Sequence, residues 1–168
     1  MVFDYMDYFV SMSVGLTGFS SDAIAPQLDT IDIKSAYLAA FDENLPTGMA
    51  EQILERYKTL FVAGGSKPGS EEQIVGQMLG GSGTSAAQIL AMRQLIFLWY
   101  AGAWPTVQSD GNSSTGGQTF STVLSADSYT QGLVWRVMQS HPMGSTTYNY
   151  GYWASNPPPL SAYLENPV

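Results

Sequence analysis

The chain has 168 residues, of which 45% are hydrophobic, so it can bury a core of domain size without disulfides. Its net charge is −8 and its six basic residues are scattered, which argues against nucleic acids and anionic membrane surfaces as partners. It has no cysteine and one histidine, which excludes thiolate metal sites, iron–sulfur clusters, covalently attached haem and histidine-pair metal sites. We expect a single domain over residues 1–168, with a helical body over 1–140 and a tail over 141–168.

Helical periodicity of apolar residues predicts three helices in the first part of the chain. The first is expected over residues 4–16, with Gly18 after its end. The second is expected over residues 32–42, after a short acidic loop. The third follows Pro46-Thr47 and runs to about residue 63.

Two further helices are predicted to begin at capping boxes, in which a serine and a glutamine three residues later satisfy each other's backbone N–H groups. These pairs are Ser70 with Gln73 and Ser85 with Gln88. The helix after Ser85 is the longest and extends to about residue 101. Because it is apolar nearly all round, we expect it to be central.

Residues 107–122 are rich in Gly, Ser and Thr and have no periodicity, which predicts a loop. A last helix is expected from Ser125 to about Ser140. Proline and aromatic residues then dominate, which predicts an extended tail. The fold class is therefore all-α: one domain of about six helices with a long Gly/Ser-rich loop and an extended aromatic C-terminal tail.

No catalytic, cofactor-binding or metal-binding residue is predicted in this chain. His141 opens a His-Pro-Met-Gly string similar to the segment that carries the flavin-facing base of glucose–methanol–choline oxidoreductases, but the dinucleotide-binding turn of those enzymes is missing. A histidine at a helix C-terminus is the favoured interpretation. The carboxylate pairs Glu51 with Glu55 and Glu71 with Glu72 are expected on solvated faces.

Residues 141–153 contain three tyrosines and a tryptophan but no charge. Such a segment must pack on the helical body or on another protein, and the sequence leaves both alternatives open. The residues predicted to form a partner interface are Trp135, His141, Tyr148, Tyr150, Tyr152 and Trp153.

Four segments carry a family resemblance, and their order and spacing span most of the chain. They are Tyr8-Phe9 through Leu16-Thr17-Gly18, Ala36-Tyr37-Leu38-Ala39-Ala40-Phe41, Ile96-Phe97-Leu98-Trp99-Tyr100-Ala101-Gly102, and residues 129–135 followed by Gly151-Tyr152-Trp153-Ala154. Together they resemble the small, gamma-type subunit of membrane-bound FAD-dependent sugar and polyol dehydrogenases (fructose, sorbitol, glucose and gluconate types).

The resemblance implies a non-catalytic subunit that binds a large FAD-containing subunit of the glucose–methanol–choline class and assists its folding and export. A multihaem cytochrome c subunit of the same complex would anchor it to the membrane and pass electrons to quinone. FAD and haem c would then belong to the partners and no cofactor to this chain. The resemblance also implies a periplasmic location, although the twin-arginine signal of such subunits is missing here. Residues 141–150 also differ from the Pro-Thr-Tyr segment of many relatives, which leaves the sugar or polyol open.

Two alternatives remain beside this interpretation. The chain is a stand-alone helical chaperone-like or binding module without a dedicated dehydrogenase partner, or it is an enzyme whose site the sequence does not reveal. A bound chromophore or turnover in the purified chain would favour the enzyme.

Overall fold

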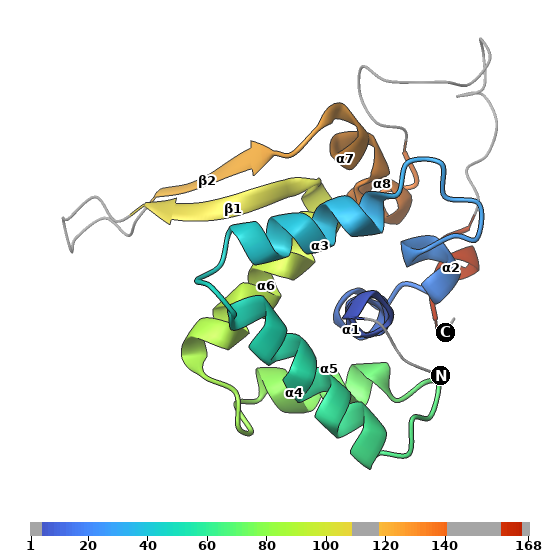
Figure 1. Ribbon diagram of the computed structural model, residues 1–168. Coiled ribbons are helices and arrows are strands. Elements are labelled where there is room, and N and C mark those ends of the chain that lie inside the picture. The colour runs from blue at the N-terminus through green and yellow to red at the C-terminus, as the bar shows by residue number, and fades with distance from the viewer. Residues whose placement is uncertain (1–4, 109–117, 141–158, 166–168) are drawn as a thin grey trace, which may run out of the picture.

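The computed structural model describes residues 5–108, 118–140 and 159–165 (Figure 1). This part of the chain is mostly helical and includes one small two-stranded sheet. None of its helices is both long and apolar enough to cross a membrane. The elements in chain order are α1 (Tyr5–Thr17), α2 (Ser21–Ile24), α3 (Ile33–Glu43), α4 (Met49–Ala63), α5 (Glu71–Leu79), α6 (Ala86–Ala101), β1 (Ala103–Gln108), β2 (Gln118–Val123), α7 (Ala126–Gln131), α8 (Leu133–Val137) and a 3-10 turn, η2 (Leu160–Ala162).

The helix at the centre of the core is α1. Figure 1 shows it end-on, with α3 and α6 on one side and α4 and α5 on the other, and it contacts all four. Phe9 and Met12 of α1 are fully buried. The prediction that α6 is central holds for one face only, since Leu90 and Phe97 on its outer face are exposed.

A glycine allows helices α1 and α5 to pack closely. At Gly15 of α1, an added Cβ would lie 2.5 Å from the backbone oxygen of Glu71, the first residue of α5. No real Cβ tolerates that distance from backbone. The absence of a side chain at this position therefore lets α1 and α5 approach each other directly.

Only one of the two predicted capping boxes forms. The Ser85 hydroxyl accepts from the backbone N–H of Gln88, and the Gln88 side chain accepts from the backbone N–H of Ser85, as predicted. Ser70 does not cap α5, because its backbone is helical (φ −91°, ψ −4°) rather than extended as capping requires. Its hydroxyl instead donates to the backbone oxygen of Lys67 at 2.7 Å.

This difference can be measured by replacing each serine. Ser85→Ala should lower the free energy of unfolding by about 1 kcal/mol, the usual cost of losing an N-cap. Ser70→Ala is the matched control and should cost clearly less, because it removes only an exposed turn bond. Urea denaturation of both variants provides the measurement. Equal losses in the two variants would contradict the capping geometry.

The prediction of a loop over residues 107–122, and with it the absence of strands, is wrong at both ends of that segment. Strands β1 and β2 pair antiparallel, from Ala103 opposite Val123 to Gln108 opposite Gln118. Both strands contain β-branched and aromatic residues, which suit a pleated surface. The Gly- and Ser-rich sequence between them concealed two strands that are too short to show a clear alternation.

The last predicted helix, over residues 125–140, is two short helices. Gly132 separates α7 from α8 with an extended backbone (φ −52°, ψ 129°). A Cβ at this position would lie 2.8 Å from the backbone oxygen of Tyr100, so the chain passes close to the end of α6 here. The short helix α2 lies in the segment that was expected to be a loop, and η2 lies in the segment that was expected to be an extended tail.

Candidate functional site

Aromatic side chains from three helices meet at Trp99 of α6, which is 2% exposed. The Tyr37 ring of α3 contacts it edge-on, with 4.7 Å between ring centroids, and the Phe9 ring of α1 lies at 6.2 Å. The Trp99 Nε1–H donates to the Ser13 hydroxyl of α1 at 2.9 Å. We refer to Phe9, Ser13, Tyr37 and Trp99 as the Trp99 cluster.

Hydrogen bonds extend this cluster to α7. The Tyr37 hydroxyl donates to the backbone oxygen of Ser128 at 3.1 Å, and the Ser128 hydroxyl donates to the backbone oxygen of Gly102 at 2.8 Å. Burial raises the pKa of Tyr37, so its hydroxyl keeps its proton and acts as a donor. These groups satisfy one another inside the protein, which is the arrangement of a structural core rather than of a reaction site.

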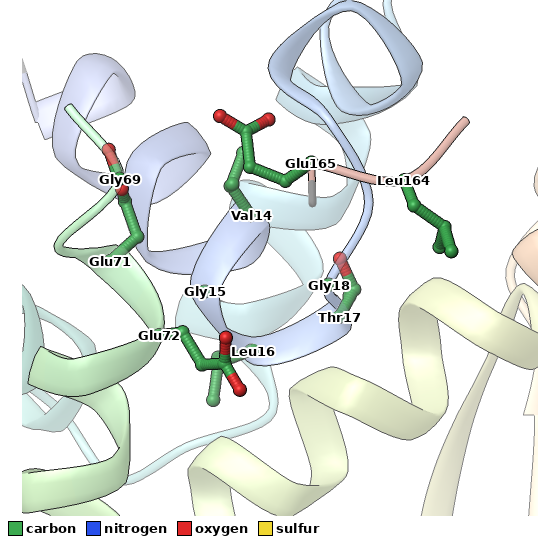
Figure 2. Close-up of a pocket in the computed structure, with 10 residues that line it drawn as sticks. All are labelled: Val14, Gly15, Leu16, Thr17, Gly18, Gly69, Glu71, Glu72, Leu164 and Glu165. Atoms are coloured by element: carbon green, nitrogen blue, oxygen red, sulfur yellow. The ribbon is translucent and has the colours of Figure 1, made fainter. Parts of the chain in front are cut away.

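A cavity of about 340 Å³ lies where the end of α1 meets the start of α5 (Figure 2). Its carboxylates are Glu71 and Glu72 of α5 and Glu165 of the C-terminal segment, and no basic or aromatic side chain lines it. Figure 2 shows the Glu72 and Glu165 carboxylates pointing in different directions. The lining residues are Val14, Gly15, Leu16, Thr17, Gly18, Gly69, Glu71, Glu72, Leu164 and Glu165.

The charge of this cavity limits what it can bind. Carboxylates repel the phosphates of a dinucleotide, and the walls offer no ring on which a flavin would stack. Among the residues that the structure describes, no three Asp, Glu, His or Cys side chains lie together in an arrangement that could hold a metal ion. The cavity therefore does not have the features of a flavin or metal site.

The carboxylate pair Glu51 with Glu55 lies on the surface, as predicted, and connects α4 to α1. The Tyr5 hydroxyl donates to an oxygen of each glutamate at 3.1 Å, and Lys58 pairs with Glu55 at 2.9 Å. The hydrogen bond to Glu55, followed by burial, raises the pKa of Tyr5 to about 12. The pair thus receives two internal partners, and neither glutamate lines the cavity of Figure 2.

Trp135 is the only residue of the predicted partner interface that lies in the described part of the chain. It is half-buried; its Nε1–H donates to the backbone oxygen of Tyr129 at 2.7 Å, and its ring meets the Tyr129 ring edge-on at 5.3 Å. The indole N–H is thus used internally, while part of the ring remains accessible. The other predicted interface residues lie outside the described residues: His141, Tyr148, Tyr150, Tyr152 and Trp153.

An apolar surface beside α8 was not predicted from the sequence. A small cavity of about 40 Å³ separates the loop between α2 and α3 from α8, with Ile31 and Arg136 among its lining residues. Leu28, in the same loop, is 93% exposed, and Met138, just after α8, is 63% exposed. We call the exposed apolar residues of these two elements the loop–α8 surface: Leu28, Ile31, Val137 and Met138.

Hydrogen bonds hold the loop that presents Leu28. One oxygen of Asp29 accepts from the backbone N–H groups of Ile31 and Asp32, at 3.2 and 2.7 Å. The other oxygen pairs with Lys34 at 3.0 Å, and Lys34 also pairs with Asp32 at 2.8 Å. Leu28 is therefore exposed on a loop with defined internal bonds. Its spacing from Ile24 and Ile31 fits one face of a helix, so the apolar pattern alone would have predicted a buried residue.

Arg136 ties α8 to the rest of the protein. Its Nη1 donates to the backbone oxygen of Ala23 at 3.1 Å, and its guanidinium group lies 5.1 Å from the centre of the Tyr163 ring. This contact is a cation–π interaction that brings the C-terminal segment against α8. The loop–α8 surface therefore has an ordered base and suits the binding of another protein better than the binding of a small molecule.

Comparisons of the chain with protein-family models, with curated proteins and with solved structures find no match.

Proposed function

We propose that this chain is the non-catalytic small subunit of a periplasmic, membrane-associated, FAD-dependent sugar or polyol dehydrogenase. It binds and stabilises the flavoprotein large subunit and assists the folding and export of that subunit. A multihaem cytochrome c subunit of the same complex accepts the electrons. FAD and haem c are then held by the partners.

The observation that carries this proposal is where the segments with the family resemblance lie. Segments 8–18, 36–41 and 96–102 are far apart in sequence, yet they meet in the Trp99 cluster. The Tyr37 hydroxyl donates to the oxygen of Ser128, the residue that precedes segment 129–135. Each of these three segments thus contributes to one contact network in the core. Their convergence supports a resemblance of the whole fold and, through it, the small-subunit assignment.

The loop–α8 surface is a second support. Leu28 and Met138 expose apolar side chains, and Trp135 of α8, three residues before Met138, is half-buried. Centres of protein interfaces favour aromatic side chains and Met over charged ones. Exposed apolar residues of this kind suit a subunit that is covered by a partner.

Purification of the tagged full-length chain from its native source tests the proposal. We expect a flavoprotein to co-purify, to release FAD on denaturation and to reduce an artificial electron acceptor when a sugar or polyol is added. The purified chain alone should be colourless. A flavin that stays with the isolated chain, or co-purification of varied proteins without flavin, would contradict the small-subunit assignment; the second result would favour a chaperone-like module.

Two variants test where this chain contacts the flavoprotein. Trp153→Ala should lower the yield of the flavoprotein, because loss of a tryptophan anchor at an interface costs at least about 2 kcal/mol. The helix content of the isolated subunit should stay the same. Phe97→Ala, which removes an exposed aromatic ring from α6, is the control and should leave the yield unchanged. Loss of helical circular dichroism in Trp153→Ala would instead assign this residue to the core.

A further inference from the structure

Among the described elements, a helix covers part of one edge of the β1–β2 hairpin, and none covers the other edge. The helix α6 packs along β1, and the Gln94 side chain of α6 donates to the backbone oxygen of Pro105 at 3.2 Å. In Figure 1 the hairpin extends beyond the helices, and β2 lies on its outer side. The open edge is therefore that of β2.

The pairing register identifies which backbone groups face outward. Antiparallel strands alternate between pairs that exchange hydrogen bonds and pairs that do not. The hydrogen bond from Leu124 N to Gly102 O, at 3.2 Å, shows that Gly102 and Leu124 form a hydrogen-bonded pair, and the other pairs alternate from there. It follows that Pro105 and Ser121 form a pair that exchanges no hydrogen bonds, which agrees with the fact that proline has no N–H. The N–H and C=O of Ser121 consequently point away from β1.

Thr119 and Val123 lie two residues on either side of Ser121 and face the same way. Within the described ranges, no backbone hydrogen bond joins these three residues to another element. Natural edge strands are usually protected by lysine, proline, a bulge or a covering segment. The sequence of β2, Gln-Thr-Phe-Ser-Thr-Val, contains neither lysine nor proline.

Charge is also absent along this edge. No charged residue occurs between Asp110 and Asp127, although the whole chain has a net charge of −8. When an antiparallel strand pairs with its own copy about a two-fold axis, both sides of the interface have the same sequence. A charge on the strand would therefore lie near the same charge on the copy and be repelled by it. β2 has no charge that would oppose such pairing.

We propose that the edge of β2 is a self-association site, at which a second copy of this chain adds its β2 antiparallel to form a four-stranded sheet, β1–β2–β2–β1. In the register centred on Ser121, that residue lies opposite its own copy and Thr119 lies opposite Val123. At the centre of the β1 edge, Pro105 has no N–H and its outward oxygen already accepts from Gln94, so we expect the assembly to close at two copies. The proposal goes beyond the small-subunit function and is independent of it.

The interface is confined to one strand edge, so the dimer should be weak and concentration-dependent. A two-stranded sheet is only marginally stable, and two added strands would stabilise it. The expected signature is specific to this geometry. Amide hydrogen exchange at Thr119, Ser121 and Val123 should slow strongly as the concentration of the isolated chain is raised, whereas Thr122, whose N–H already faces β1, should slow only as far as the hairpin itself is stabilised.

Sedimentation of the full chain and of two edge variants tests the site. Ser121→Pro removes the outward N–H without touching a bond of the hairpin, and Ser121→Lys places two like charges opposite each other. Each should raise the dimer dissociation constant at least about tenfold, equivalent to 1.4 kcal/mol. Thr106→Lys adds the same charge to exposed β1 and should leave the constant nearly unchanged. An Hα–Hα contact between Ala103 and Val123 in NMR spectra reports that the hairpin is intact.

Several results would overturn this inference. They are a chain that stays monomeric at all concentrations, a dimer that is insensitive to both Ser121 variants, and a dimer without the alternating exchange pattern. Protection of Ser121 only when a flavoprotein is added, with the isolated chain monomeric, would assign the edge to that partner instead. That result would leave the proposed function standing and remove the self-association site alone.

Discussion

Replacing Gly102 by alanine is expected to destabilise the protein by about 2–5 kcal/mol. Gly102 has φ +66°, and a residue with a Cβ loses about 1–2 kcal/mol in this left-handed region. The added Cβ would also lie 2.1 Å from the backbone oxygen of Ser128, and overpacking of this kind costs about 1–3 kcal/mol. Urea denaturation followed by circular dichroism measures the loss.

Gly18→Ala separates the two contributions. Gly18 has a similar backbone angle, φ +75°, but no atom lies within 4 Å of its added Cβ. Its loss should therefore be limited to the backbone cost of about 1–2 kcal/mol. If both variants lose the same free energy, the close approach of Gly102 to α7 is not what makes glycine necessary there.

Replacing Trp99 by alanine should cost about 3–5 kcal/mol, the range for removal of a large buried aromatic side chain. The change removes the ring contacts with Phe9 and Tyr37 and leaves the buried hydroxyl of Ser13 without its donor. Phe97→Ala on the same helix is the matched control, because its ring is 40% exposed. We expect the control to cost much less in the same denaturation experiment.

A further variant tests the hydrogen bond within this cluster. Trp99→Phe keeps most of the apolar contact but not the N–H, so its cost should fall between those of the other two. A loss for Trp99→Ala no larger than that for Phe97→Ala would show that the Trp99 cluster is not the centre of the core. It would also weaken the small-subunit proposal, which depends on this convergence.

The sequence predicted the main helices well, because each apolar stripe is a local signal. The predicted helix over residues 4–16 corresponds to α1 at Tyr5–Thr17, and the helix predicted after Ser85 ends at Ala101. The strands were missed because six residues carry little pattern and the Gly- and Ser-rich segment between them suggested a loop. The cap at Ser70 failed because capping depends on backbone angles, which the residue types alone do not determine.

Predictions about the site were limited by contacts between distant segments. The hydrogen bond from Trp99 to Ser13 joins α6 to α1, and no local pattern announces it. The exposure of Leu28 depends on the bonds of Asp29 and Lys34 that hold its loop. Trp135 was predicted as a partner contact, and its internal bond to Tyr129 was not predicted. Its role as a partner contact stays a prediction.

The pairing of Phe19 with Leu164 has a consequence for biosynthesis. Ser20 N donates to Tyr163 O at 2.9 Å, and Glu165 N donates to Gly18 O at 3.2 Å, so the end of α1 is bonded to the last described residues of the chain. A nascent chain emerges from its N-terminus, and these bonds can form only when the C-terminal residues have left the ribosome. The loop between Ser20 and Tyr163 is long, but its length adds little to the entropy cost of closing it, because each doubling of loop length costs only about 0.6 kcal/mol. The core can therefore assemble during translation, while the bonds of Gly18 and Ser20 to Tyr163 and Glu165 form only after these last two residues have left the ribosome.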